Sequence, residues 1–373
     1  MKRKMVLGLM IILGIMIQAQ ELSRKGNHWR FSEQKTIEVK PGGMLKLIDI
    51  SGDVDIRTWD QPKVQIDAAY EIDVYTQNEA EAIKQKLQDS VVKEDNQVVL
   101  QGTDFERKSV FSEYRITVPK TFNCNANVNG GDFSIEGLNG QLEVNLGGGD
   151  MSISEVLGPI KVQQGGGDMS IDGCEKELSV KLGGGDIEVQ NAGSGVELQV
   201  GGGDVELTDC AGPVKLELGG GDLEISDVKN GVKAKVGGGD MEFYSVQGGV
   251  DCEVGGGSLE MNDISGSVNA RAGAGDIELG IAELPADAAV HVETGMGEIT
   301  LTLPADIKAS LQAEIRKMFD YSDEEIDSDF PLQMNMEKGD GSNYIRAKAE
   351  LNGGGPAIIL KTKGGDISIE KED

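Results

Sequence analysis

Apolar and polar residues alternate along most of this chain, and the alternation recurs every 18 residues. In the unit from Gly147 to Gln164, Met151 and Ile153 flank one polar residue, and Ile160 and Val162 flank another. A period of two is typical of strands that bury one face and expose the other. Each unit therefore predicts two short strands joined by turns.

The pattern keeps its register from one unit to the next. The counterparts of Met151 are all apolar: Met169, Ile187, Val205, Leu223, Met241, Leu259 and Ile277. The residue that closes each glycine-rich turn follows the same interval, at Asp132, Asp150, Asp168, Asp186, Asp204, Asp222, Asp240, Ser258 and Asp276. A four-residue insertion around "AELPADAA" delays the next counterpart, Glu298, to a spacing of 22. A fixed repeat length predicts units that stack with equivalent residues in line.

Stacking solves the problem that one such unit has alone. A single pair of strands leaves its apolar face and its edges open and is marginally stable at best. When each coil pairs with the next, the apolar faces form one continuous core. The sequence therefore predicts an all-β fold, a single-chain β-solenoid (parallel β-helix) with 18-residue coils, in residues 119–303. The rival is an up-and-down sandwich or barrel, which the strict repeat and the glycine triplet at one corner disfavour.

The two ends of the array carry different patterns. Residues 20–118 are predicted to form a β-rich region with one helix, at about 78–92, for which Asn78 is the expected N-cap. This region should cover the open end of the solenoid, since natural proteins cover exposed strand edges. The segment 52–68 resembles a solenoid unit with one inserted residue, its first strand containing Val54 and its second containing Val64. Residues 304–373 should form a C-terminal β region with strands in "YIRAKAEL", "AIILKTK" and "DISIEKE".

The first 19 residues have the pattern of a secretory signal peptide. Lys2, Arg3 and Lys4 precede an unbroken apolar run from Met5 to Ile17, which is short for a membrane span. The alternative is an uncleaved N-terminal anchor. The sequence thus predicts an exported protein, periplasmic or at the cell surface, with no stable membrane span in its mature form.

Composition narrows the set of partners. The chain has 64 acidic and 35 basic residues, a net charge of −29, and only 4% aromatic residues. So large an acidic excess opposes binding to nucleic acid or to anionic lipid. Four cysteines occupy apolar columns of the repeat and are predicted to be buried thiols, since none forms a C-x-x-C pair: Cys124, Cys174, Cys210 and Cys252.

Four segments make the chain similar to a known family. They are "GDVDIRTWDQPKVQI", "YRITVPKTFNCNANVNGGDFSIEGLNGQLEV", "HVETGMGEITLTLP" and "AIILKTKGGDISIEK". In these segments the chain resembles the bacterial putative-adhesin family of unknown function with β-strand repeats. The resemblance covers nearly all of the mature chain and implies a secreted β-helical envelope protein. It implies no catalytic residues, because the shared motifs describe stacked strands.

The recurring GGGD corner has three chemical interpretations. A phosphate cradle is disfavoured because a strand, rather than a helix, follows each corner. Calcium is a second interpretation, with Asp186, Asp204, Asp222 and Asp240 as candidate ligands, although the spacing differs from that of calcium-binding β-rolls. The favoured interpretation is structural: glycine turns the chain, and glycine amides donate hydrogen bonds to each aspartate.

The sequence favours a non-enzymatic scaffold or adhesin-like envelope protein that presents an acidic, repetitive surface to a protein partner or envelope component. One alternative is a rod stabilised by divalent cations. Another is a β-helix that binds or cleaves polysaccharide, which such proteins do with grooves built from long inserted loops. Neither catalytic residues nor a required cofactor is predicted. The histidines, His28 and His291, are isolated in the sequence, and the partner and oligomeric state stay open.

Overall fold

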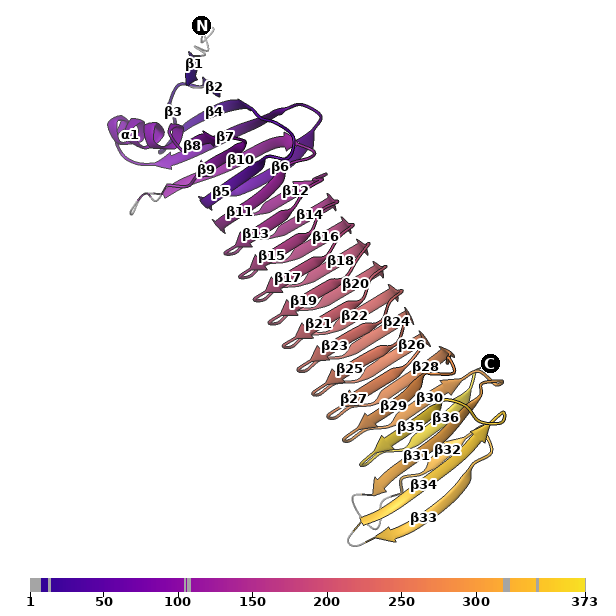
Figure 1. Ribbon diagram of the computed structural model, residues 1–373. Coiled ribbons are helices and arrows are strands. Elements are labelled where there is room, and N and C mark those ends of the chain that lie inside the picture. Colours follow the sequence, from indigo (N-terminus) through magenta and orange to yellow (C-terminus); the bar gives the residue numbers. More distant parts are fainter. Residues whose placement is uncertain are drawn as a thin grey trace. The chain divides into compact units, whose positions relative to one another are not determined.

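A computed structural model describes residues 8–12, 15–103, 105, 109–317, 323–339 and 342–372 of the protein. The chain divides into two compact units, unit 1 (residues 1–185) and unit 2 (residues 186–373). The described residues are nearly all β, in long sheets of mostly parallel strands, which is consistent with a β-solenoid-like fold. Each unit consists of two facing sheets, called sheet A and sheet B below (Figure 1).

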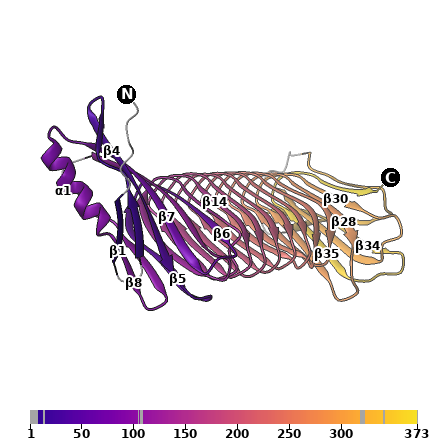
Figure 2. The same ribbon diagram turned by 90° about the horizontal axis from the view of Figure 1, so that it is seen from above.

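Unit 1 begins with a cap of longer strands and one helix. Figure 2 shows the helix, α1, at the end of the unit away from the coil strands. The cap elements are β1 (Gly8–Ile12), β2 (Ile15–Ala19), β3 (Ser23–Lys25), β4 (His28–Glu38), β5 (Met44–Ser51), β6 (Asp53–Trp59), β7 (Lys63–Asp73), α1 (Gln77–Gln88), β8 (Val91–Glu94), β9 (Gln97–Gln101) and β10 (Ser109–Pro119).

The helix is present where the sequence predicts one, but with different ends. Its N-cap is Thr76, whose side chain accepts a hydrogen bond from the amide of Glu79, so the predicted cap at Asn78 is wrong. The helix ends at Gln88 rather than near residue 92. The chain turns there because the next residues form β8, which pairs antiparallel with β9.

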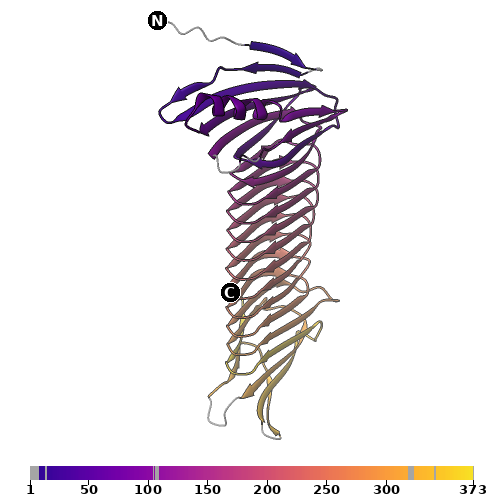
Figure 3. The ribbon, with the colours of Figure 1, turned by 90° about the vertical axis from the view of Figure 1, so that its left-hand side faces the viewer.

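Sheet A of the cap changes from antiparallel to parallel pairing. The strands β1, β2, β4, β7 and β10 pair antiparallel in that order, and β10 then pairs parallel with β6. Figure 3 shows the indigo and purple strands of this cap near the N-terminus. The apolar part of the predicted signal peptide supplies β1 and β2, whereas Lys2, Arg3 and Lys4 lie outside the described residues. Within the described ranges, no helix is long and apolar enough to cross a membrane.

The coil strands of unit 1 pair parallel and in register. Leu142 pairs with Ile160 in sheet B, and Met151 pairs with Met169 in sheet A. Residues 142, 144 and 146 from sheet B and 151, 153 and 156 from sheet A are buried between the sheets. The strands are β11 (Asn123–Gly130), β12 (Phe133–Glu136), β13 (Leu142–Leu146), β14 (Met151–Val156), β15 (Ile160–Gln164), β16 (Met169–Cys174) and β17 (Leu178–Leu182).

The irregular first coil is built differently from its prediction. As expected, β6 aligns with the regular strand β12, with Val54 opposite Phe133. The segment containing Val64 is not the second strand of this coil, because it forms β7, which pairs antiparallel with β4 and β10. The sheet B strand of the coil is β5, which precedes β6 and pairs parallel with β11.

Unit 2 continues with paired strands of the same kind. In sheet A they are β18 (Ile187–Ala192), β20 (Val205–Cys210), β22 (Leu223–Val228), β24 (Met241–Gln247), β26 (Leu259–Ser265), β28 (Ile277–Glu283), β30 (Ile299–Leu303), β32 (Ile326–Ser328) and β36 (Ile367–Lys371). In sheet B they are β19 (Val196–Val200), β21 (Val214–Leu218), β23 (Val232–Val236), β25 (Val250–Val254), β27 (Val268–Ala272), β29 (Ala289–Thr294), β31 (Ala309–Lys317), β33 (Gln333–Gly339), β34 (Ser342–Leu351) and β35 (Ala357–Thr362).

The last strands of unit 2 are inserted within the stack. In sheet B, β35 lies between β29 and β31 and pairs parallel with both. In sheet A, β36 lies between β30 and β32 in the same way. The strands β34 and β33 then extend sheet B by antiparallel pairing beyond β31, at the end of the unit coloured orange and yellow in Figure 1. All three predicted C-terminal strands are therefore present.

Candidate functional site

The glycines of the GGGD corner have two different environments. An added Cβ on Gly219 would lie 2.3 Å from the carbonyl oxygen of Gly201, and one on Gly221 would lie 2.2 Å from that of Gly203. Gly221 also has a φ of +122°, which side chains disfavour. The middle residue, Gly220, has no such contact below 3.7 Å. The first and third glycines thus let successive coils approach each other, as the structural interpretation requires.

Aspartates that follow these glycines form a row linked through the backbone. In unit 2, Oδ1 of Asp186 accepts a hydrogen bond from the amide of Asp204 (2.9 Å), and Oδ1 of Asp204 accepts one from the amide of Asp222 (2.9 Å). The same bond joins Asp222 to the amide of Asp240, at 2.9 Å. Unit 1 has the equivalent bond from the amide of Asp150 to Asp132, at 3.0 Å.

The sequence-based prediction that glycine amides donate hydrogen bonds to these carboxylates is therefore wrong. Glycine amides at the corner donate instead to main-chain carbonyls: Gly219 to Val200 (2.9 Å) and Gly221 to Gly238 (3.1 Å). Each carboxylate instead accepts a hydrogen bond from the amide of the aspartate in the following coil, because parallel stacking brings equivalent residues together. A carboxylate that accepts from an amide is stabilised in its charged form, which offsets repulsion from its neighbours.

The four calcium candidates lie in this row. Asp186, Asp204, Asp222 and Asp240 occupy successive corners, and each offers its Oδ1 to the amide of the next coil. Among the described residues, no group of three or more His, Cys, Asp and Glu side chains is arranged to hold a metal ion. The structure thus brings the candidates into a line rather than around a common centre.

A second acidic row runs beside the first on the outer face of sheet A. Successive residues pair directly across the strands, with Glu188 opposite Glu206 and Glu224 opposite Glu242. Strands in a sheet lie about 4.8 Å apart, so adjacent carboxylates repel each other by roughly 0.8 kcal/mol even in water. The row comprises Glu188, Glu206, Glu224, Glu242, Glu260 and Glu278.

Neighbouring polar groups support parts of this row. The hydroxyl of Tyr244 donates to Glu242 at 2.9 Å, and this bond raises the pKa of Tyr244 to about 12. The side-chain amide of Asn262 donates to Glu260 at 2.7 Å. The strands β18, β20, β22, β24, β26 and β28, all of them described, contain no lysine or arginine. The glutamates of this face therefore have no cation on their own strands.

Sheet B of unit 2 has a different charge pattern. Lys215 contacts Glu197 at 2.7 Å, and Lys235 contacts Glu253 at 2.9 Å. The hydrogen bond from Lys235 holds the pKa of Glu253 below its usual range. Lys233 is paired with Asp251 in the same way. Cations thus neutralise carboxylates on sheet B, and the acidic excess of the unit is concentrated on sheet A.

The four cysteines are buried and outside any disulfide, as the sequence predicts. Burial raises the pKa of the Cys124 thiol to about 12 and that of Cys174 to about 11, and it raises the pKa of Cys252 as well. These three thiols are therefore protonated at neutral pH and pack as core residues.

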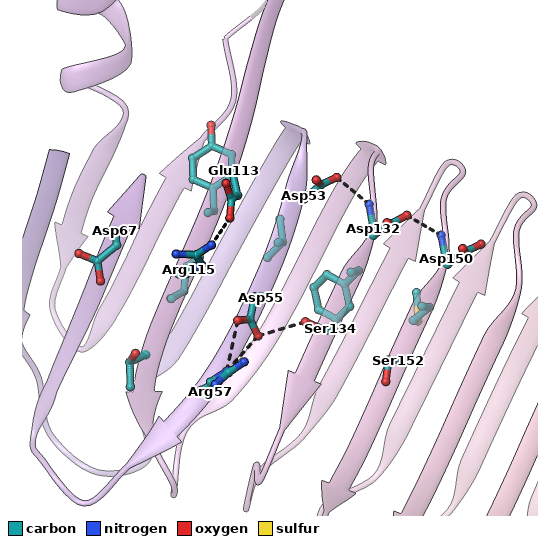
Figure 4. A pocket seen from close by; sticks show the side chains of 16 residues that line it. Asp53, Asp55, Arg57, Asp67, Glu113, Arg115, Asp132, Ser134, Asp150 and Ser152 are labelled. Carbon is teal, nitrogen blue, oxygen red and sulfur yellow. Dashed lines mark hydrogen bonds and ion pairs between the residues drawn. The ribbon is translucent and has the colours of Figure 1, made fainter. Parts of the chain in front are cut away.

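A groove of about 880 Å³ lies on the outer face of sheet A in unit 1, over β10, β6, β12 and β14 (Figure 4). Both of its arginines are already paired: Arg115 with Glu113, and Arg57 with Asp55, at 3.2 Å. Asp55 also accepts from the hydroxyl of Ser134 at 3.1 Å. These internal pairs are typical of a solvated sheet surface, and the sequence analysis did not single them out.

The profile of the family described as Toastrack DUF4097 matches residues 45–247 and, in a second match, residues 175–370. The chain belongs to this family. The resemblance to a family of adhesin-like proteins of unknown function is thereby confirmed. The two matches overlap within the repetitive part of the Toastrack chain, where successive units have the same pattern.

Solved structures align with most of this Toastrack chain at low similarity. A "putative adhesin" from Bacteroides fragilis is 15% identical, with 91% of this chain and 97% of that chain covered and a TM-score of 0.24. A "putative lipid binding protein" from Parabacteroides distasonis is 15% identical (94% and 98% covered, TM-score 0.25). A "putative cell adhesion protein" from Clostridium sporogenes is 10% identical (91% and 99% covered, TM-score 0.16). No curated protein matches the chain.

A second recurring corner escaped the sequence analysis. Near the end of several sheet A strands, one residue has a positive φ, for example Asp209 at 57° and Asp227 at 56°. Asparagine, aspartate and glycine tolerate this conformation best. The repeat places such residues at Gly173, Asn191, Asp209, Asp227 and Asp263, whereas Glu155 and Ser245 have a positive φ at the equivalent positions, so this preference was only a partial signal.

Proposed function

We propose that this protein is a non-enzymatic, exported β-solenoid scaffold with 18-residue coils that presents the acidic face of unit 2 to a basic protein partner. The observation that carries the proposal is the asymmetry of charge: the glutamate row lies on sheet A, whereas Lys215, Lys233 and Lys235 lie on sheet B. A surface of one sign steers a partner of the opposite sign and selects against others.

The corner aspartates support this function by shaping the face rather than by binding a cofactor. Each already accepts a backbone hydrogen bond, so no cation is required to hold the row in place. The glutamates beside them project from a flat sheet at regular intervals. A basic segment with a similar spacing of lysines or arginines could therefore contact several of them at once.

The test is a pair of variants with equal changes in net charge. In the first, five sheet A residues become glutamine: Glu188, Glu206, Glu224, Glu260 and Glu278. In the second, five sheet B residues become the matching amides: Glu197, Glu217, Asp251, Glu253 and Glu293. The probe is a twelve-residue lysine peptide, with binding measured by calorimetry at two salt concentrations.

We expect the sheet A variant to bind the peptide at least fivefold more weakly and with a smaller salt dependence, because the face that attracts the peptide has lost its charge. The sheet B variant should change by less than twofold. Equal losses in both variants would show that net charge alone governs binding, which contradicts a dedicated face.

Export is tested separately by treating intact cells with a protease. Degradation of the protein, while a periplasmic marker stays intact, is expected for a partner outside the cell. Complete protection would contradict exposure at the cell surface.

A further inference from the structure

Unit 1 contains a second groove, which opens where the repeat loses its regularity. It has a volume of about 690 Å³ and is formed by the turns that connect sheet A to sheet B. In the regular coils these turns are short, as in the "LGP" of residues 157–159. Next to them, the hairpin at Trp59–Pro62 and the turn around Pro41 widen the corner. We call this the tryptophan groove.

Trp59 is held in a fixed orientation in the wall of this groove. Its indole Nε1 donates to the carbonyl oxygen of Lys63 at 2.8 Å, and its own carbonyl accepts from the amide of Lys120 at 3.1 Å. The neighbouring turn is fixed in the same manner, because the amide of Asn139 donates to the carbonyl of Lys120 at 2.7 Å. The aromatic surface therefore needs little reorganisation to receive a ligand.

The rim of the groove is apolar in a protein whose surface is otherwise rich in charge. Pro41 and Pro62 are exposed beside Trp59, and the side chain of Leu157, which also lines the groove, is 38% exposed. The other tryptophan of the chain, Trp29, is buried at 8% exposure. Trp59 is thus the tryptophan available to a ligand.

Polar groups of both signs complete the lining. Lys120 forms an ion pair with Asp60, at 3.1 Å, and Arg57, Glu136 and Asn139 lie nearby. This near balance contrasts with the net charge of −29 of the whole chain and selects neither a polyanion nor a polycation. Carboxylates, an amide and cations beside an aromatic ring match a ligand with many hydroxyl groups and apolar C–H faces.

We propose that the tryptophan groove binds a neutral oligosaccharide, with one sugar ring stacked on Trp59 and hydroxyl groups bonded to Asp60, Asn139 and Lys120. The volume lies within the range of small-ligand sites. The inference is independent of the acidic face, because the groove lies entirely in unit 1.

The experiment uses the full chain, three saccharide probes and a proline-rich peptide as a competing ligand. The saccharides are cellohexaose, laminarihexaose and N-acetylchitohexaose. Tryptophan fluorescence is recorded during titration to millimolar concentration, and affinity is measured by calorimetry. At least one probe should cause a saturable change in fluorescence. In Trp59→Phe, which keeps a ring, binding should persist by calorimetry within about threefold, while the fluorescence change disappears because only Trp29 remains.

Trp59→Ala should weaken binding about tenfold or more, which corresponds to the loss of one stacking contact. The matched control is Tyr75→Ala, which removes an aromatic side chain that is 94% exposed elsewhere in unit 1. That variant should bind as the natural protein does. The proposal is overturned if no probe binds, if both alanine variants lose affinity equally, or if a proline-rich peptide saturates the groove while the saccharides do not.

Discussion

Gly219 and Gly220 are adjacent and identical in type, yet they tolerate a side chain to different degrees. A Cβ on Gly219 would lie 2.3 Å from a backbone oxygen, whereas the nearest atom to a Cβ on Gly220 would be a backbone oxygen 3.7 Å away. The chain itself uses this freedom, since Ala274 and Met296 occupy the middle position of later corners. The approach of successive coils is therefore sufficient to require glycine at the first and third positions.

Gly219→Ala should lower the free energy of unfolding by about 1–3 kcal/mol, because a backbone carbonyl must move to admit the methyl group. Gly220→Ala, the matched control, should change it by about 0.5 kcal/mol or less. Urea denaturation followed by circular dichroism measures both. Equal effects would contradict the assignment of the close contact to the first glycine.

The thiols provide a test of core burial at the same scale. Because the pKa of Cys124 is raised to about 12, iodoacetamide should leave it unmodified at pH 8 in the native protein and modify it fully in guanidinium. Above the unfolded-state pKa, near 9, the unfolded chain gains thiolate that the native state resists. Stability should therefore fall as pH rises from about 9 towards 12. Rapid native alkylation, measured by mass spectrometry, would contradict this burial.

Some residue roles could be predicted from the sequence and others could not. The inward apolar columns follow directly from alternation. Gln164 stands in such a column and is nonetheless buried, because its side-chain amide donates to the carbonyls of Gly149 (2.8 Å) and Gly167 (3.0 Å). Those carbonyls converge only after the coils have stacked, so no local pattern predicts the contact.

At the level of elements, both units insert one coil out of chain order near an end of the stack. In unit 1, β5 and β6 lie between the later strands β9 and β10 on one side and β11 and β12 on the other. In unit 2, β35 and β36 lie between β29 and β30 on one side and β31 and β32 on the other. The sequence predicts these strands but not their order in the sheets. A strand can pair with any sheet edge that is still unpaired, and the alternation of apolar residues does not specify which edge that is.

The cap helix offers a test of local structure. Thr76→Ala removes the side chain that accepts from the amide of Glu79 and should cost about 1 kcal/mol. Asn78→Ala, at the cap position expected from sequence, should have little effect because that residue lies inside the helix and is exposed. Thermal melts of the two variants distinguish the positions. A larger loss in the Asn78 variant would contradict the observed cap.

For the molecule as a whole, charge is distributed by sheet within unit 2. The aspartate row was expected from the repeat, and the glutamate row, two residues further along each unit, has the same 18-residue interval. The ion pairs of sheet B, such as that of Lys215 with Glu197, were not predicted, although these residues are 18 positions apart and the repeat makes them neighbours on sheet B. The tryptophan groove is likewise invisible in the sequence, since its walls come from five separate turns.

The measurement that most directly tests whether backbone amides, rather than cations, hold the corner carboxylates is a pair of thermal melts of the natural protein. One contains millimolar calcium and the other contains a chelator. Because each aspartate in the row already accepts an amide hydrogen bond, the two midpoints should agree within about 1 °C. A saturable rise of several degrees with calcium, reversed by the chelator, would contradict this and assign the row to metal binding.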